Sequence, residues 1–103
     1  MCLFCKIANK ELPSAIVYED AEMMAFNDIN PKAKTHLLII PKQHIDSSLT
    51  LKEKEKGVPA QLVWTAKKIA EQKGLEGYRL SFNVGEKGGQ IVFHLHLHLM
   101  ANQ

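Results

Sequence analysis

The segment that most restricts the fold of this chain is Phe93–Leu99, where histidine and apolar residues alternate over seven positions. Successive side chains of a β-strand point to opposite faces, so the segment predicts a strand with one apolar face and one imidazole face. The apolar face would hold Phe93, Leu95, Leu97 and Leu99, and the other face would hold His94, His96 and His98. At about 3.3 Å per residue, the outer two histidines begin about 13 Å apart, so one metal ion cannot easily bind all three.

Two interpretations of the imidazole face are open at this point. An amphipathic strand can simply turn three polar side chains toward solvent. Imidazole is an unusual choice for such a face, however, because a neutral imidazole near pH 7 is a competent nucleophile, metal ligand and proton carrier. Three histidines in register therefore favour a functional site.

Several other segments have strand patterns. Two short strands joined by a tight acidic turn are predicted at Ile16–Tyr18 and Met23–Phe26. The apolar run His36–Ile40, which Pro41 stops, is typical of a central strand buried on both faces. Tyr78–Val84 also alternates and is predicted to form a hairpin with the histidine strand.

One long helix is predicted between these strands. Thr50–Glu53 has the spacing of a capping box, and a second helical piece is expected to begin near Pro59 and to end at a cap on Gly74. Its buried face would comprise Leu62, Ala66, Ile69 and Ala70. The order of elements predicts an α+β fold, with an antiparallel sheet of about five strands, one long helix and short helical pieces.

Length and composition indicate one domain over residues 1–103, since 103 residues with 46% apolar content is an ordinary globular size. The net charge of +2 comes from 13 basic and 11 acidic residues without a block of like charge, so no nucleic acid partner is expected. No segment has the apolar character of a signal peptide or a membrane span, so we expect a cytoplasmic protein without membrane contact. Cys2 and Cys5 would then stay reduced, and their spacing suits metal binding or redox chemistry.

The histidine segment resembles a known family. His94–Met100 matches the signature of the histidine triad family, in which three histidines alternate with apolar residues. The resemblance to bacterial members extends to Cys2–Ile7, Phe26–Pro31, Thr35–His44 and Asn83–Gln90. It implies the fold of that family, and the branch that the chain resembles most is the histidine triad nucleotide-binding proteins.

Members of that branch are purine nucleoside phosphoramidases that dimerise through a shared sheet, so the resemblance implies a purine nucleotide substrate and a homodimer. Histidine rather than glutamine at His98 disfavours the nucleotidyltransferase branch. The dinucleotide polyphosphate hydrolase branch shares the triad and stays open as an alternative.

The resemblance also implies roles for individual residues. His96 would be the nucleophile that takes the nucleoside phosphate, His98 would donate to a phosphate oxygen or the leaving group, and His36 would border the phosphate. The expected nucleotide-binding residues are Leu3, Phe4, Phe26, Asp28, Ile29, Leu38, Asn83, Gly89, His96 and His98.

Among these residues the tasks differ. Asp28 would accept hydrogen bonds from the ribose, Asn83 and Gly89 would border the phosphate, and the apolar residues would border the purine. Each apolar side chain could equally belong to the core, and the glycines of the loop could equally serve a plain turn.

Two departures from the family pattern bear on activity. Ile91 stands where many relatives have a serine whose hydroxyl contacts the phosphate or leaving group, so slower turnover or an altered leaving-group preference is expected. Many relatives also continue past Ala101–Gln103 with a tail that reaches the partner's active site. Both departures keep open a nucleotide-binding module with vestigial catalysis.

The cysteine pair supplies two of the four ligands that a tetrahedral zinc site needs, and His44 and His94 are the candidates for the rest. The resemblance implies a structural zinc on these four positions, with no cofactor needed for catalysis. A metal-binding or redox protein is the rival from another class, in which His96 and His98 would chelate a metal and the cysteines would cycle as a dithiol.

Overall fold

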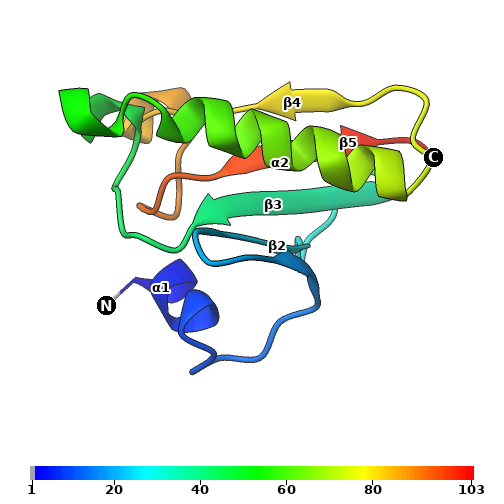
Figure 1. Ribbon diagram of the computed structural model, residues 1–103, viewed down its shortest axis with the longest axis horizontal. Helices are drawn as coiled ribbons and strands as arrows, with labels where there is room; N and C mark the ends of the chain where they lie inside the picture. Colours follow the sequence, from blue (N-terminus) through cyan, green and yellow to red (C-terminus); the bar gives the residue numbers. More distant parts are fainter. Residues whose placement is uncertain (1) are drawn as a thin grey trace.

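The structure is a computed structural model that describes residues 2–103. Its centre is a five-stranded antiparallel sheet in the order β1-β2-β3-β5-β4 (Figure 1). The strands are β1 (Ile16–Glu19), β2 (Met23–Asn27), β3 (Thr35–Pro41), β4 (Arg79–Ser81) and β5 (Leu97–Ala101). The predicted α+β class and the central position of the His36–Ile40 run are therefore confirmed.

The helices comprise α1 (Leu3–Ala8), α2 (Val58–Gln72) and three short 3₁₀ turns, at Ser48–Thr50, Glu53–Glu55 and Glu86–Gly88. Pro59 lies in the first turn of α2, where its missing N–H costs nothing. Gly74, just past the C-cap, has a φ of +67°, which confirms the predicted glycine cap. No helix among residues 2–103 has the length and apolar character needed to cross a bilayer.

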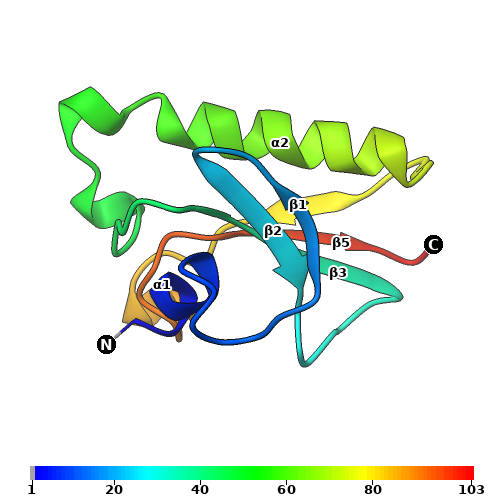
Figure 2. The ribbon, with the colours of Figure 1, turned by 60° about the horizontal axis from the view of Figure 1, so that its bottom comes forward.

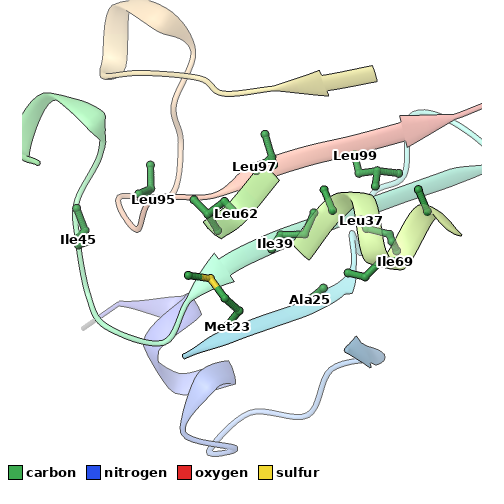
Figure 3. Close-up of a cluster of buried hydrophobic side chains, with 12 residues drawn as sticks. Met23, Ala25, Leu37, Ile39, Ile45, Leu62, Ile69, Leu95, Leu97 and Leu99 are labelled. Atoms are coloured by element: carbon green, nitrogen blue, oxygen red, sulfur yellow. The ribbon is translucent and has the colours of Figure 1, made fainter. Parts of the chain in front are cut away.

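The two faces of the sheet carry different clusters. The helix α2 packs across β3 and β5, and the buried face predicted for it is confirmed (Figures 1 and 3). The core between this helix and the sheet is formed by Met23, Ala25, Leu37, Ile39, Ile45, Leu62, Ala66, Ile69, Ala70, Leu95, Leu97 and Leu99.

The opposite face is covered partly by α1 (Figure 2). Phe4 and Ile7 of this short helix pack on Met24, Phe26 and Leu38 of the strands. Six residues are too few for a helix that is stable by itself, so α1 depends on this contact. The smaller cluster lies on the face of the sheet that also presents His36 and His98.

The predicted strand over Phe93–Leu99 is wrong at its start, because β5 begins only at Leu97. In the register of β3 with β5, Ile39 pairs with Leu97, so Leu95 would next face Pro41. Proline has no N–H to donate, and Leu95 instead donates its N–H to the Ile45 carbonyl at 2.6 Å.

Phe93 is also not a core residue as predicted, since it is 45% exposed. Phe93 lies four residues before β5, outside the strand, so the strand alternation does not set the direction of its side chain. The other strand of the predicted hairpin is shorter than Tyr78–Val84. It pairs with β5 only over Arg79–Ser81, and a long connection rather than a tight turn joins the two strands.

The predicted capping box at Thr50–Glu53 is also wrong. Ser47 caps the first 3₁₀ turn by accepting the Leu49 N–H, and the Thr50 hydroxyl oxygen accepts the Ser47 N–H. Thr50 therefore ends one turn instead of starting the next, because Lys52 is extended between them.

Candidate active site and metal centre

Three of the predicted site histidines meet on the face of the sheet that faces away from α2. His36 on β3 and His98 on β5 lie side by side, with His36 Nε2 3.0 Å from His98 Nδ1. The ring of His96, one residue before β5, lies 5.0 Å from the ring of His98. The structure thus brings the predicted catalytic residues His36, His96 and His98 together.

The hydrogen bonds assign a tautomer to the His36–His98 pair. The Lys32 backbone N–H donates to His36 Nδ1 at 3.0 Å, so the His36 proton sits on Nε2. His36 Nε2–H then donates to His98 Nδ1, which leaves the His98 proton on Nε2. A carboxylate oxygen of Asp28 lies 3.4 Å from the same His36 Nε2. His98 can therefore offer an N–H to a group bound above the sheet.

His96 has the opposite tautomer. Its Nδ1 lies 2.7 Å from the His94 carbonyl oxygen, which can only accept, so the proton is on Nδ1. The Nε2 lone pair is free of that bond, and the residue is 8% exposed. His96 is therefore the imidazole with the electronic form that a nucleophile needs.

The surroundings keep these imidazoles neutral. Burial lowers the pKa of His96, and burial together with the nearby His96 and His36 rings lowers the pKa of His98 to about 4. The pKa of His94 is also lowered, again mainly by burial. At neutral pH the rings of His94, His96 and His98 thus present lone pairs and N–H donors rather than imidazolium charges.

The apolar residues predicted to border a purine divide into two groups. Phe4, Phe26 and Leu38 are buried in the smaller cluster, and the Phe4 ring lies edge-on 5.1 Å from the His96 ring. Leu3 and Ile29 are exposed, Ile29 by 90%. Leu3 and Ile29 are thus free to contact a ligand, whereas the buried three belong to the cluster whose Phe4 ring contacts His96.

The polar residues predicted to contact the nucleotide lie in turns. One Asp28 oxygen accepts the Asn30 N–H, and the other faces His36. Asn83 donates from its amide to the Gly88 carbonyl at 3.1 Å. Gly89 has a φ of +88°. Residues with a side chain are strained in this backbone conformation, so the turn favours glycine at that position.

A second group of ligand atoms lies beside the catalytic candidates. The Sγ atoms of Cys2 and Cys5 lie 3.3 and 3.5 Å from His94 Nδ1, and Cys5 Sγ lies 3.2 Å from His44 Nδ1. All four ligand atoms lie within 4.8 Å of one another. A tetrahedron with zinc bonds of about 2.0 Å to nitrogen and 2.3 Å to sulfur has edges of about 3.3–3.8 Å, so the residues fit zinc.

The Nε2 atoms of His44 and His94, which point away from the cysteines, each have a hydrogen-bond acceptor, as in other metal sites with histidine ligands. His94 Nε2 lies 2.8 Å from the Pro41 carbonyl and His44 Nε2 lies 2.6 Å from Asp46 Oδ1. These bonds place each proton on Nε2 and leave each Nδ1 unprotonated toward the cysteines. Burial and the adjacent Cys2 raise the pKa of the Cys5 thiol to about 11, so a metal ion must displace that proton.

The rival metal hypothesis uses His96 and His98, whose ring centroids lie 5.0 Å apart. Asp28, His36 and His98 form the other cluster of metal-capable side chains among residues 2–103, and His96 belongs to neither cluster. Since both ring nitrogens of His36 are already engaged by Lys32 and His98, hydrogen bonding accounts for that cluster.

Sequence reasoning missed one polar residue at the site. Gln90 is buried and its side-chain amide bonds to three separate parts of the backbone. Its only signal in the sequence is an uncharged polar residue directly after two glycines. Ile91, in contrast, is 88% exposed and has no polar side-chain atom to offer a ligand.

Comparison with known proteins gives a consistent result. Residues 1–103 match the family described as scavenger mRNA decapping enzyme C-term binding. Protein HitA of Neisseria gonorrhoeae is 47% identical over 96% of this chain and 94% of its own length. The 14 kDa zinc-binding protein of Zea mays is 45% identical over 98% of this chain and 81% of its own length.

Two solved structures superpose on nearly the whole length of this chain. A HIT family hydrolase from Legionella pneumophila superposes with a TM-score of 0.95 at 48% identity, covering 100% of this chain and 94% of the other. A histidine triad protein from Clostridium difficile superposes with a TM-score of 0.96 at 46% identity, covering 99% and 90%. With the HIT-like fold and the three-histidine motif in place, the chain belongs to the histidine triad (HIT) family.

Proposed function

We propose that this protein hydrolyses purine nucleoside phosphoramidates through a covalent nucleotidyl intermediate on His96. The observation that carries the proposal is the tautomer of His96, whose Nδ1–H is held by the His94 carbonyl so that Nε2 keeps its lone pair. The hydrolase name of the Legionella pneumophila relative supports a hydrolytic reaction. The resemblance to the nucleotide-binding branch supports the choice of substrate.

The reaction would proceed in two displacements at phosphorus. His96 Nε2 forms a bond to phosphorus while the bond from phosphorus to the amine nitrogen breaks, and that nitrogen takes a proton from solvent. The His98 Nε2–H stays on its ring and donates a hydrogen bond to a phosphate oxygen. Water then forms the new bond to phosphorus, the bond to His96 breaks, and one proton returns to solvent. The products are the free amine and a nucleoside monophosphate.

The nucleotide would lie over the smaller cluster. Leu3 and Ile29 would contact the purine above Phe4, Phe26 and Leu38, and Asp28 would accept hydrogen bonds from the ribose. Asn83, Gly89 and the other residues of their turn would border the phosphate, because glycines let backbone N–H groups approach an anion.

We further propose that Cys2, Cys5, His44 and His94 bind a structural zinc, in keeping with the geometry of the four ligand atoms. Bound there, zinc would supply a cross-link between α1 and the segment before β5. No catalytic step needs it, since His96 and His98 stay outside the ligand set. We also place the protein in the cytoplasm, as a homodimer that shares its sheet.

A mass spectrum of protein quenched during turnover of an adenosine phosphoramidate tests the reaction. The triad peptide should gain the mass of one adenylate, and fragmentation should locate it on His96. Saturable mononucleotide binding with neither adduct nor product would contradict the proposal and identify a binding module, a result in line with the exposed Ile91. Measuring the turnover of a diadenosine polyphosphate beside that of the phosphoramidate shows which of the two substrate classes the protein prefers.

A further inference from the structure

The segment that carries His96 is not held by the sheet. β5 starts at Leu97, so residues 91–96 need other anchors. The Leu95 N–H bond to the Ile45 carbonyl is one of them. A nucleophile must be held within a fraction of an ångström of its target, so the remaining anchors matter for catalysis.

Gln90 provides such an anchor with every polar atom of its side chain. Its Oε1 accepts the Gly85 N–H at 2.9 Å, and its Nε2 donates to the Asp46 carbonyl at 2.7 Å and to the Val92 carbonyl at 3.0 Å. The side chain therefore joins the turn that begins at Gly85, the segment after β3, and the segment that leads to His96. With an exposed fraction of only 5%, it makes these bonds away from competing water.

The backbone of Gln90 closes the same turn. Its N–H donates to the Gly85 carbonyl at 3.0 Å, so Gly85 and Gln90 are joined by two hydrogen bonds in opposite directions. The turn between them contains Gly88 and Gly89, which the proposed function puts at the phosphate. Gln90 thus fixes the shape of this turn and, through Val92, its distance from the histidines.

We propose that Gln90 is a positioning residue that holds the glycine turn and the His96 segment in one fixed relation, so that a phosphate on the turn meets His96 Nε2. This inference rests on the proposed function. Gln90 itself need not touch the nucleotide, because both amide hydrogens and the amide oxygen are already used within the protein. Its effect should therefore appear in phosphate alignment and not in recognition of the nucleoside.

The test is Gln90→Met, which keeps the length of the side chain and removes its hydrogen bonds. Hydrogen exchange of the Gly85 amide should become at least about tenfold faster, and formation of the His96 adduct in a single turnover should slow about tenfold to a hundredfold. AMP should bind more weakly, whereas adenosine, which lacks the phosphate, should keep its affinity within about twofold. Gln61→Met is the matched control, because the Gln61 side chain donates to the exposed Glu22 carboxylate and lies on α2, on the other face of the sheet from His96.

Unchanged adduct formation in Gln90→Met would overturn the inference, as would equal losses of AMP and adenosine affinity. If the wild-type protein forms no adduct, the proposed function fails. The hydrogen exchange of the Gly85 amide and the ratio of AMP to adenosine affinity then decide the role of Gln90 by themselves.

If Gln90→Met does not fold, Gln90→Glu replaces it. This variant keeps an acceptor for Gly85 but turns a carboxylate toward two carbonyls, so Gly85 should stay protected while adduct formation slows. Unfolding of both variants would reject a positioning role in favour of a structural one.

Discussion

At the scale of single residues, the site is defined by where each imidazole proton sits. Backbone groups assign those protons: the Lys32 N–H sets the tautomer of His36, and the His94 carbonyl sets that of His96. The five histidines of the chain are thereby prepared for the different tasks that we propose for them, as hydrogen-bond donor, nucleophile or metal ligand. Small changes in backbone position are consequently expected to alter the chemistry.

Replacing the nucleophile candidate gives the first prediction. His96→Ala should lower phosphoramidate turnover by about a thousandfold or more, because the covalent step is lost, while AMP affinity stays within a few fold. Steady-state kinetics and calorimetric titration with AMP measure the two effects. Normal hydrolysis by the variant would show that another group attacks phosphorus.

The low pKa of His98 gives the second prediction. Its pKa is about 4 in the folded protein and about 6.5 when unfolded, so the unfolded chain binds the proton more readily between those values. The contribution of His98 to stability is therefore complete above about pH 6.5 and is lost as the pH falls toward 4. Allowing for its partial exposure, we expect a loss of about 1 kcal/mol between pH 7.5 and pH 5.

Urea unfolding of the wild-type protein and of His98→Gln at both pH values measures this loss. The variant should lose less stability on acidification, since it has no imidazole at this position to protonate. Identical losses in the two proteins would assign the acid sensitivity to other groups.

At the scale of elements, α1 is the part of the fold whose stability depends most on a few contacts. Six residues cannot sustain a helix alone, and α1 packs on the sheet through Phe4 and Ile7. The two cysteines contact His44 and His94, which lie outside the strands. A metal ion that binds Cys2, Cys5, His44 and His94 would link α1 to the segments that follow β3 and precede β5. Removal of the ion should loosen α1 before the sheet is affected.

Metal removal or Cys5→Ser gives the third prediction. Either change should lower the Tm by about 10 °C, with the metal content falling to below one equivalent per chain. The zinc-free but folded protein should still form the His96 adduct, because His96 and His98 are not ligands. Loss of the adduct along with the metal would instead support the rival metal hypothesis.

At the scale of the whole molecule, the sheet ends in two edge strands, β1 and β4. β4 is only three residues long, and Tyr78 just before it is exposed. A cavity of about 300 Å³ between Lys32, Tyr78, Arg79 and Met100 adjoins this edge. An edge strand with unpaired backbone groups is a ready place for a second copy to add its own strand.

The mass in solution gives the fourth prediction. Sedimentation equilibrium should report twice the 11.6 kDa of one chain at micromolar concentration, in keeping with a shared sheet. A single-chain mass that persists as the concentration rises would contradict the homodimer.

Several parts of this protein follow from short-range patterns and can be predicted without a structure. The continuous apolar run in His36–Ile40, the helical spacing from Leu62 to Ala70 and the glycine at Gly74 are local signals, and the structure agrees with each. The metal-ligand set and the catalytic candidates came from the family resemblance, and in the structure each set comes together. Their chemical roles stay predictions.

The first residue of β5 and the ring nitrogen that carries each histidine proton depend on contacts between segments that are far apart in the sequence. The strand pattern continues through Phe93, but pairing stops at Leu97, since Pro41 offers no N–H and the Leu95 N–H bonds to Ile45. Gln90 gave little sequence signal because its role depends on its hydrogen bonds to the nearby Gly85 N–H and Val92 carbonyl and to the distant Asp46 carbonyl. Periodicity determines which face a residue occupies, whereas hydrogen-bond partners between distant segments exist only once the chain has folded.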